Sequence, residues 1–271
     1  MKPEYREEPC RNALNRVTGM SFRWSLNPYT GCAHRCTFCF VRAFELRADR
    51  PFDDRYGTSI RVKTNIAEVL DRELRRKSWK RELVVVGTAT DPYQPAEGRY
   101  RLTRACIERL AAHHTPLHFI TRGPMIVRDV DVLSEAARQA KVSITFSVPT
   151  LDHEIWRKTE IGTAPPQQRL RALRQLVDAG FDVGVGMAPI LPGLSDKPEL
   201  LPRYEHLYDA RAYLPKPVTE PVRKAVRELV RVHGIEDRRS LRLAPPPDPE
   251  QLALPLAPGD PGMRIVPPSA A

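Results

Sequence analysis

The sequence of 271 residues lacks any long apolar stretch. It contains no run of 18 consecutive apolar residues, so no segment is expected to cross a membrane. The first ten residues, MKPEYREEPC, are mostly polar and lack the apolar centre of a secretory signal. We therefore expect a cytoplasmic protein. The apolar share of 41% is enough to form a core, which excludes wholesale disorder.

Cysteine is scarce, and its distribution is uneven. The chain has five cysteines, and three of them, Cys32, Cys36 and Cys39, fall within eight residues. An odd number with this clustering is a poor basis for a disulfide framework. The spacing C-x3-C-x2-C instead indicates a [4Fe–4S] cluster with one iron left open for a substrate or cofactor. The alternative is structural zinc, which needs a fourth ligand at a standard spacing. The remaining candidates, none at such a spacing, are His34, Cys10 and Cys106.

The chain carries an excess of basic residues. There are 43 Lys and Arg residues against 33 Asp and Glu residues, which gives a net charge of +10. Such an excess is typical of proteins with an anionic partner such as nucleic acid. The basic residues are spread along the chain rather than clustered, so charge alone does not define a binding surface.

Short apolar runs alternate with helical patterns. Buried strands are predicted at 83–87, 117–121, 142–148 and 182–190, and shorter strands at 22–26 and 59–63. Helices are predicted at 39–48, 65–77, 102–113, 128–139 and 166–179, with Asn65 as an N-cap. This alternation predicts an α/β protein with a parallel sheet closed into a barrel or part of one. Ligands in such folds bind at the carboxyl ends of the strands.

Composition divides the chain into four parts. Residues 1–21 are polar and are predicted to be an irregular lead-in, and residues 22–196 form the α/β core. Residues 197–239 are predicted to be a helical region that includes a basic amphipathic helix at 218–232. The proline-rich residues 240–271 are predicted to be a disordered tail.

Three segments carry a resemblance to a known family. The pattern C-x3-C-x-aromatic-C after the first barrel strand resembles the signature of the radical S-adenosylmethionine (SAM) superfamily. The segments NPYTGCAHRCTFCF, GTATDPYQPAE (87–97) and 160–196 are similar to its spore photoproduct lyase-like, or repair photolyase, branch. The resemblance covers roughly residues 22–196. It implies a partial (β/α) barrel in which Cys32, Cys36 and Cys39 ligate a [4Fe–4S] cluster.

The resemblance also implies a reaction. S-adenosylmethionine would chelate the open iron, and an electron from a flavodoxin- or ferredoxin-type donor would cleave it. The resulting 5′-deoxyadenosyl radical abstracts a hydrogen atom from the substrate. The cofactors supply this chemistry, while the protein supplies orientation and excludes water.

Several other positions match the family's cofactor site. Phe38 would shield the cluster. Arg122 would bind the carboxylate of S-adenosylmethionine, with a surface arginine as the alternative. Ser147 would bind ribose or amine unless it is a satisfied core serine, and Ala188 would meet adenine unless it only packs. Asp91 would position substrate or hold its loop.

Other residues that match the family or carry reactive groups are expected to be structural. Glu160 and Arg169 should pair with each other, and Cys106 should be a buried, inert thiol. Cys10 has no predicted role.

The chain departs from the lyases in its hydrogen-transfer residues. Thr88 stands where the lyases carry a cysteine hydrogen donor, and Phe38 and Phe40 stand where they carry tyrosines. Thr88 and Asp91 are the only catalytic candidates, and thymine-dimer repair is not assigned. A nucleic acid is the leading substrate hypothesis. The alternatives are a radical maturase acting on protein or tRNA, and a non-catalytic iron–sulfur or zinc protein that binds nucleic acid.

The chain is also short after the third matching segment. Only about 16 residues separate Asp196 from Tyr213, so we expect the sixth βα unit to be missing or replaced. An open barrel would expose a strand edge, which proteins normally cover. The helix at 218–232 or a second subunit would cover it.

Overall fold

The computed structural model describes residues 3–47, 52–53, 55–189 and 191, together with Glu220, Lys224, Glu228, Arg231 and Val232. The strands are β1 (Glu4–Glu8), β2 (Leu14–Arg16), β3 (Trp24–Leu26), β4 (Tyr29–Thr30), β5 (Ser59–Lys63), β6 (Val84–Val86), β7 (Leu117–Thr121), β8 (Val142–Ser147) and β9 (Asp182–Gly186). The helices are α1 (Val41–Arg47), α2 (Ile66–Leu74), α3 (Pro95–Tyr100), α4 (Leu102–Ala112), the 3-10 helix η1 (Pro124–Asp129), α5 (Val130–Gln139), α6 (His153–Thr159) and α7 (Pro166–Asp178).

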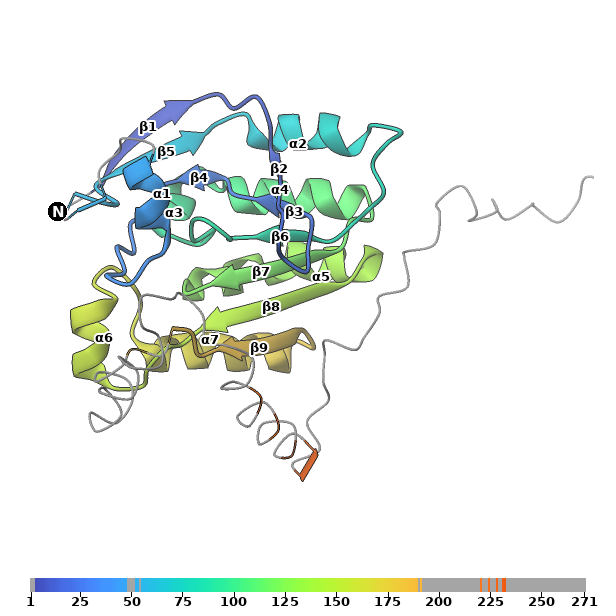
Figure 1. Cartoon of the computed structure of the whole chain (residues 1–271). Coiled ribbons are helices and arrows are strands. Elements are labelled where there is room, and N and C mark those ends of the chain that lie inside the picture. The colour runs from blue at the N-terminus through green and yellow to red at the C-terminus, as the bar shows by residue number, and fades with distance from the viewer. Residues whose placement is uncertain are drawn as a thin grey trace, which may run out of the picture.

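Six strands form the main sheet, in the order β2-β3-β6-β7-β8-β9. Strands β3, β6, β7, β8 and β9 are parallel, and β2 pairs antiparallel with β3 at one edge. Helices connect the successive parallel strands (Figure 1). A smaller sheet, β1-β5-β4, lies beside it. This arrangement is the predicted partial (β/α) barrel.

The two faces of the main sheet differ in chemistry. Alternate residues such as Val84, Phe119 and Ile144 are buried in the apolar core beneath the helices. The other face carries His118 on β7, which contacts Ser143 Oγ at 2.8 Å and Thr145 Oγ1 at 3.3 Å on β8. The polar face is therefore the inner face of the partial barrel, where a ligand would bind.

The predicted strands and helices of the core are present, but the strand predicted at 182–190 ends at Gly186. Two further expectations also differ from the structure. The irregular structure expected before residue 22 is wrong, because β1 and β2 lie there. Their backbone groups pair with β5 and β3, which compensates for a charged sequence such as EYREE. Asn65 does occupy the predicted N-cap position directly before α2, but its side chain makes no capping hydrogen bond. Its side chain accepts a hydrogen bond from Cys10 N at 2.7 Å and donates one to Cys10 O at 3.2 Å, which leaves the helix uncapped by it.

Some predictions fall outside the described residues. These are the missing sixth βα unit after residue 196 and the tail at 240–271. Within 218–232, the five described positions are helical and exposed. No helix among the described residues is both long enough and apolar enough to span a bilayer.

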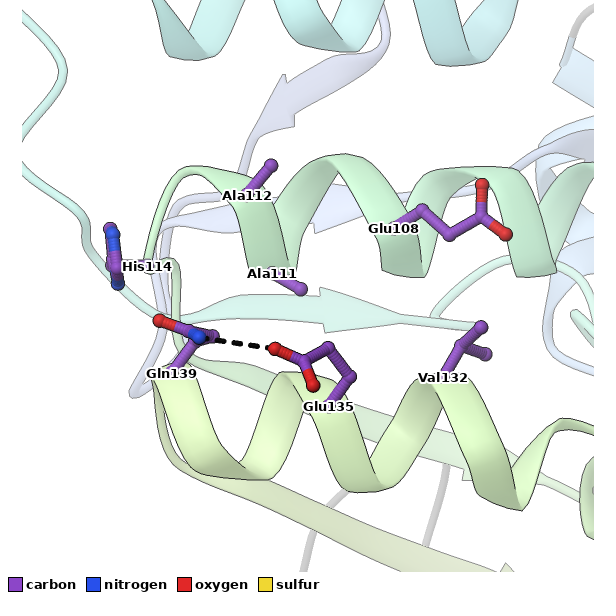
Figure 2. A pocket seen from close by; sticks show the side chains of 7 residues that line it. All are labelled: Glu108, Ala111, Ala112, His114, Val132, Glu135 and Gln139. Carbon is purple, nitrogen blue, oxygen red and sulfur yellow. Dashed lines mark hydrogen bonds between the residues drawn. The ribbon is translucent and has the colours of Figure 1, made fainter.

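A surface groove lies between α4 and α5 (Figure 2). Helix α4 and the turn after it contribute Glu108, Ala111, Ala112 and His114, and helix α5 contributes Val132, Glu135 and Gln139. His114 lies three residues before β7 and Gln139 three residues before β8, so the groove reaches toward the amino ends of these strands. It is thus separate from the cysteine segment, which lies at the opposite ends of the strands.

Candidate functional site

The three clustered cysteines lie on the loop between β4 and α1, at the carboxyl side of the sheet (Figure 1). Cys32 and Cys36 are buried and Cys39 is half-buried. All three are free thiols. We call residues 31–40 the cysteine loop.

One side of the cysteine loop is held by the segment after β6. Thr90 Oγ1 donates a hydrogen bond to Gly31 O at 2.6 Å, and Gln94 Nε2 donates to the same carbonyl at 3.1 Å. Gln94 Oε1 in turn accepts a hydrogen bond from Ala33 N at 3.0 Å. The sequence TATDPYQP therefore supplies the loop's backbone partners, which explains one matching segment in structural terms.

The other side of the loop is held by the end of α6. Thr37 N donates to Thr159 O at 2.9 Å, and Gly162 N donates to His34 O at 2.9 Å. A Cβ at position 162 would lie 2.3 Å from Ala33 O, closer than any real contact. Only glycine permits this approach, so Gly162 in the segment EIGTAPP is required for the loop to seat.

His34 of the cysteine loop forms a buried ion pair with Asp91 of the segment after β6. His34 Nδ1 lies 3.3 Å from Asp91 Oδ2, without the alignment of a good hydrogen bond. Burial disfavours the charged forms of both side chains, but the attraction between the imidazolium and the carboxylate outweighs this effect. It raises the pKa of His34 to about 10 and lowers the pKa of Asp91 to about 2. Burial likewise opposes ionisation of Cys32, yet the positive charge on His34 gives this thiol a lowered pKa.

Asp91 also connects the segment after β6 to the end of β7. Its carboxylate accepts hydrogen bonds from Tyr93 N at 2.8 Å, Thr121 Oγ1 at 2.7 Å and Arg122 N at 2.6 Å. The side chain is buried. These contacts favour the loop-holding alternative for Asp91 over contact with substrate, although its role stays a prediction.

Thr88, the other catalytic candidate, is half-buried beyond the end of β6. Its Oγ1 accepts a hydrogen bond from Asn27 Nδ2 at 3.1 Å, and Asn27 Oδ1 accepts one from Ala89 N at 3.0 Å. Asn27 thus ties the end of β3 to the turn after β6. Asn27 is the first residue of the matching segment NPYTGCAHRCTFCF, but only the fold shows that it joins these two strand ends.

Glu160 is shared by two arginines. Its Oε1 lies 2.9 Å from Arg122 Nε and 2.9 Å from Arg169 Nη1. Glu160 and Arg169 are fully buried, which confirms their predicted pairing. Arg122 is only partly buried, and its guanidinium stacks over the Phe38 ring at 5.5 Å from the centroid. Arg122 is therefore a positioned side chain rather than a freely moving surface arginine.

The predicted cofactor residues share the inner face. Ser147 ends β8 and pairs with Gly186, and Arg122 directly follows β7, so both continue the His118 face. Ala188 follows β9 with the same alternation and is exposed. Phe38 reaches this group from the cysteine loop through its contact with Arg122. The structure thus brings the predicted residues to one end of the inner face.

The polar atoms there fit an amino acid-like ligand. Within the described ranges, Arg122 Nη1 and Nη2 and Ser147 Oγ make no hydrogen bond, and buried Glu160 Oε2 has no partner. Two free guanidinium donors suit a carboxylate, while an unpaired carboxylate oxygen suits an amine. Both groups occur in the methionine part of S-adenosylmethionine.

A single metal ion and a cluster make different demands on the positions of the cysteines. In the part of the chain that the structure describes, no three His, Cys, Asp or Glu side chains converge closely enough to surround one metal ion. Zinc needs all its ligands within bonding distance, so the three cysteines and His34 would have to move together to hold it. A cubane binds its thiolates at separate corners, so they need not converge.

The two remaining cysteines lie away from the loop. Cys106 is buried in the core on α4, and burial raises its pKa well above the ordinary thiol value. It therefore stays protonated and inert at neutral pH, as predicted. Cys10 is half-buried beside Asn65, and burial raises its pKa as well.

Comparison with known proteins identifies the class. The Radical SAM superfamily profile matches residues 26–201, which include the cysteine loop and the strands β6 to β9. The chain therefore belongs to the radical SAM superfamily. Membership supports an enzyme that uses S-adenosylmethionine.

Particular relatives fall into two groups. An uncharacterized protein of Mycobacterium tuberculosis is 36% identical over 93% of this chain and 86% of its own length. The radical SAM Nalpha-GlyT isomerase of Pseudomonas phage M6 is 25% identical over 66% of this chain and 36% of its own. Among solved structures, a spore photoproduct lyase variant with bound AdoMet and dinucleoside spore photoproduct superposes with a TM-score of 0.54.

That structural likeness concerns the fold. The sequence identity to the lyase variant is 19%, and the match covers 70% of this chain. The chain spans about half of the lyase, 53% of its length. The predicted resemblance of the core to this branch is confirmed at the level of the fold.

Proposed function

We propose that the chain is a radical SAM enzyme in which Cys32, Cys36 and Cys39 hold a [4Fe–4S] cluster. The observation that carries the proposal is the cysteine loop itself. Three free thiols lie on one loop whose backbone is fixed by Gln94 on one side and Gly162 on the other. Such preorganisation is what a cluster with an open iron requires.

The surrounding residues have separate tasks in this proposal. Arg122 binds the carboxylate of S-adenosylmethionine, and Glu160 both orients Arg122 and accepts a hydrogen bond from the ligand's amine. Ser147 contacts the same ligand from the end of β8, and Ala188 leaves space for the adenine. Phe38 excludes water from the cluster. When bound, the cluster and S-adenosylmethionine supply a 5′-deoxyadenosyl radical for hydrogen abstraction, given an electron from a flavodoxin- or ferredoxin-type donor.

The direct test is product formation under anaerobic conditions. The protein is reconstituted with iron and sulfide, reduced with dithionite and mixed with S-adenosylmethionine. We expect a [4Fe–4S] absorption and EPR signature and the appearance of 5′-deoxyadenosine by chromatography. A bound cluster without cleavage, even with candidate substrates added, favours the non-catalytic alternative. Zinc in place of iron would contradict the proposal.

A nucleic acid is the substrate class we propose for this site. The net charge of +10 supports it, as does the lyase structure with a bound dinucleoside. Contacts between basic side chains and phosphates release counterions, so affinity must fall steeply with salt. We expect binding of single- or double-stranded DNA or RNA, measured by fluorescence anisotropy, to weaken at least tenfold between about 50 and 200 mM salt. Affinity that does not change with salt would favour a protein substrate, as in the maturase alternative.

A further inference from the structure

Tyr56 is a buried tyrosine that packs against the cysteine loop from the segment before β5. Its side chain is 1% exposed and belongs to a small apolar cluster with Cys32 and Val41. Its backbone is also tied to this region, since Tyr56 O accepts a hydrogen bond from Arg35 Nε at 3.1 Å. The next residue, Gly57, has a φ of +75°, and a Cβ there would lie 2.2 Å from Cys32 O. The Tyr56 carbonyl and the close approach of Gly57 therefore fix this tyrosine against the cysteine loop.

The phenol hydroxyl reaches a cysteine sulfur. Tyr56 Oη lies 3.5 Å from Cys39 Sγ, within hydrogen-bond distance for sulfur. A tyrosine hydroxyl has an ordinary pKa of about 10, so the phenol keeps its proton at neutral pH. A thiolate that ligates iron carries no proton and can only accept. In that state the hydrogen bond has one direction, from Tyr56 to Cys39.

Arg42 strengthens this donor. Its guanidinium lies over the Tyr56 ring, 4.7 Å from the centroid. The guanidinium is fixed by hydrogen bonds to Cys36 O at 3.2 Å and to Phe52 O at 2.7 Å. A cation on the ring face draws electron density from the phenol, which makes the O–H a better donor. The same positive charge also favours added negative charge nearby.

We propose that Tyr56 sets the reduction potential of the cluster by donating a hydrogen bond to Cys39. The inference rests on the proposed function, since it requires the cluster at the three cysteines. Hydrogen bonds to ligand sulfurs stabilise the reduced, more negative cluster and raise its potential. Tyr56 is thus a positioning and tuning residue for the electron transfer that starts the reaction, and it does not touch substrate.

The test compares midpoint potentials of reconstituted clusters by EPR-monitored titration. We expect Tyr56→Phe to shift the equilibrium about tenfold toward the oxidised cluster, which is about 59 mV for a one-electron couple. The change removes one oxygen and keeps the ring under Arg42. Arg42→Gln, which leaves Tyr56 in place, should shift the potential in the same direction by less, and it carries the test if Tyr56→Phe does not fold.

Tyr29→Phe is the matched control. Tyr29 is equally buried, but its hydroxyl donates to Glu97 Oε2 at 2.5 Å and not to a cysteine. It should leave the potential unchanged. Equal potentials in wild type and Tyr56→Phe, both with full clusters, would overturn the inference and leave the proposed function intact. Absence of any cluster in the wild type would overturn the proposed function itself.

Discussion

Replacing Cys36 by alanine is expected to reduce 5′-deoxyadenosine formation to background and to remove most of the bound iron. Two thiolates cannot hold a cubane that needs three protein ligands, so the change eliminates the centre rather than weakening it. Burial raises the pKa of the Cys36 thiol to about 12 despite the nearby Arg122 charge, so without iron it is an ordinary protonated thiol. Iron content, EPR and product chromatography measure the effect.

Cys106→Ala is the control for this prediction. Cys106 is as buried as Cys36 but lies in the main apolar core, whereas Cys36 does not. We expect the control to bind a full complement of iron and cleave S-adenosylmethionine at the wild-type rate. Equal iron in Cys36→Ala and wild type would mean that other residues hold the metal, and the assignment of the cysteine loop would be wrong.

The second large effect concerns stability. Arg169→Met is expected to lower the free energy of unfolding by about 3 to 5 kcal/mol, the usual cost of leaving one partner of a buried ion pair uncompensated. Arg169 donates to Glu160 Oε1 and Ser147 O at 2.9 Å and to Thr163 Oγ1 at 2.5 Å. Arg122 still contacts Glu160, so the loss should fall near the lower end of that range. Urea denaturation followed by circular dichroism measures it.

Arg174→Met, on the same helix, is the control. It shows how much stability is lost when an exposed ion pair is removed instead of a buried one. Arg174 pairs with Asp178 at 2.8 Å, but both side chains are largely exposed. Exposed pairs contribute at most about 1 kcal/mol, so this variant should unfold close to wild type. Similar losses of stability in the two variants would contradict the prediction. They would mean that the buried contacts of Arg169 with Glu160 and Ser147 contribute no more to stability than an exposed ion pair.

The core fold could be predicted from the sequence because its strands carry apolar runs, as in β6, or alternate apolar with polar residues, as in β7 and β8. The segments LHFIT and VSITFS appear as β7 and β8 in register. Strands β1 and β2 could not be predicted, since their pairing partners, rather than their own charged residues, define them. Asn65 stands at the N-cap position of α2. Its side chain, however, forms a hydrogen bond with the backbone of Cys10, 55 positions away along the chain, and not with the helix.

The candidate site was predictable where spacing carries the chemistry. The cysteines, Arg122, Ser147 and Ala188 could be placed because strand ends in a parallel sheet meet at one edge. The sharing of Glu160 between Arg122 and Arg169 could not be predicted, because it depends on side-chain directions in space. Tyr56 was missed for a similar reason: a single tyrosine in a loop has no periodicity, and only the fold brings it to Cys39.

The double attachment of the cysteine loop determines when during synthesis the proposed cluster could form. Thr37 contacts Thr159 across 122 positions of chain, so this side of the loop remains unsupported until α6 has left the ribosome. Contacts of such long sequence separation form late, after the intervening units have docked. Iron delivered to a nascent chain would meet three mobile thiols open to oxidation. Maturation of this protein is therefore expected to be post-translational, with the apo fold as the species that cluster-assembly machinery receives.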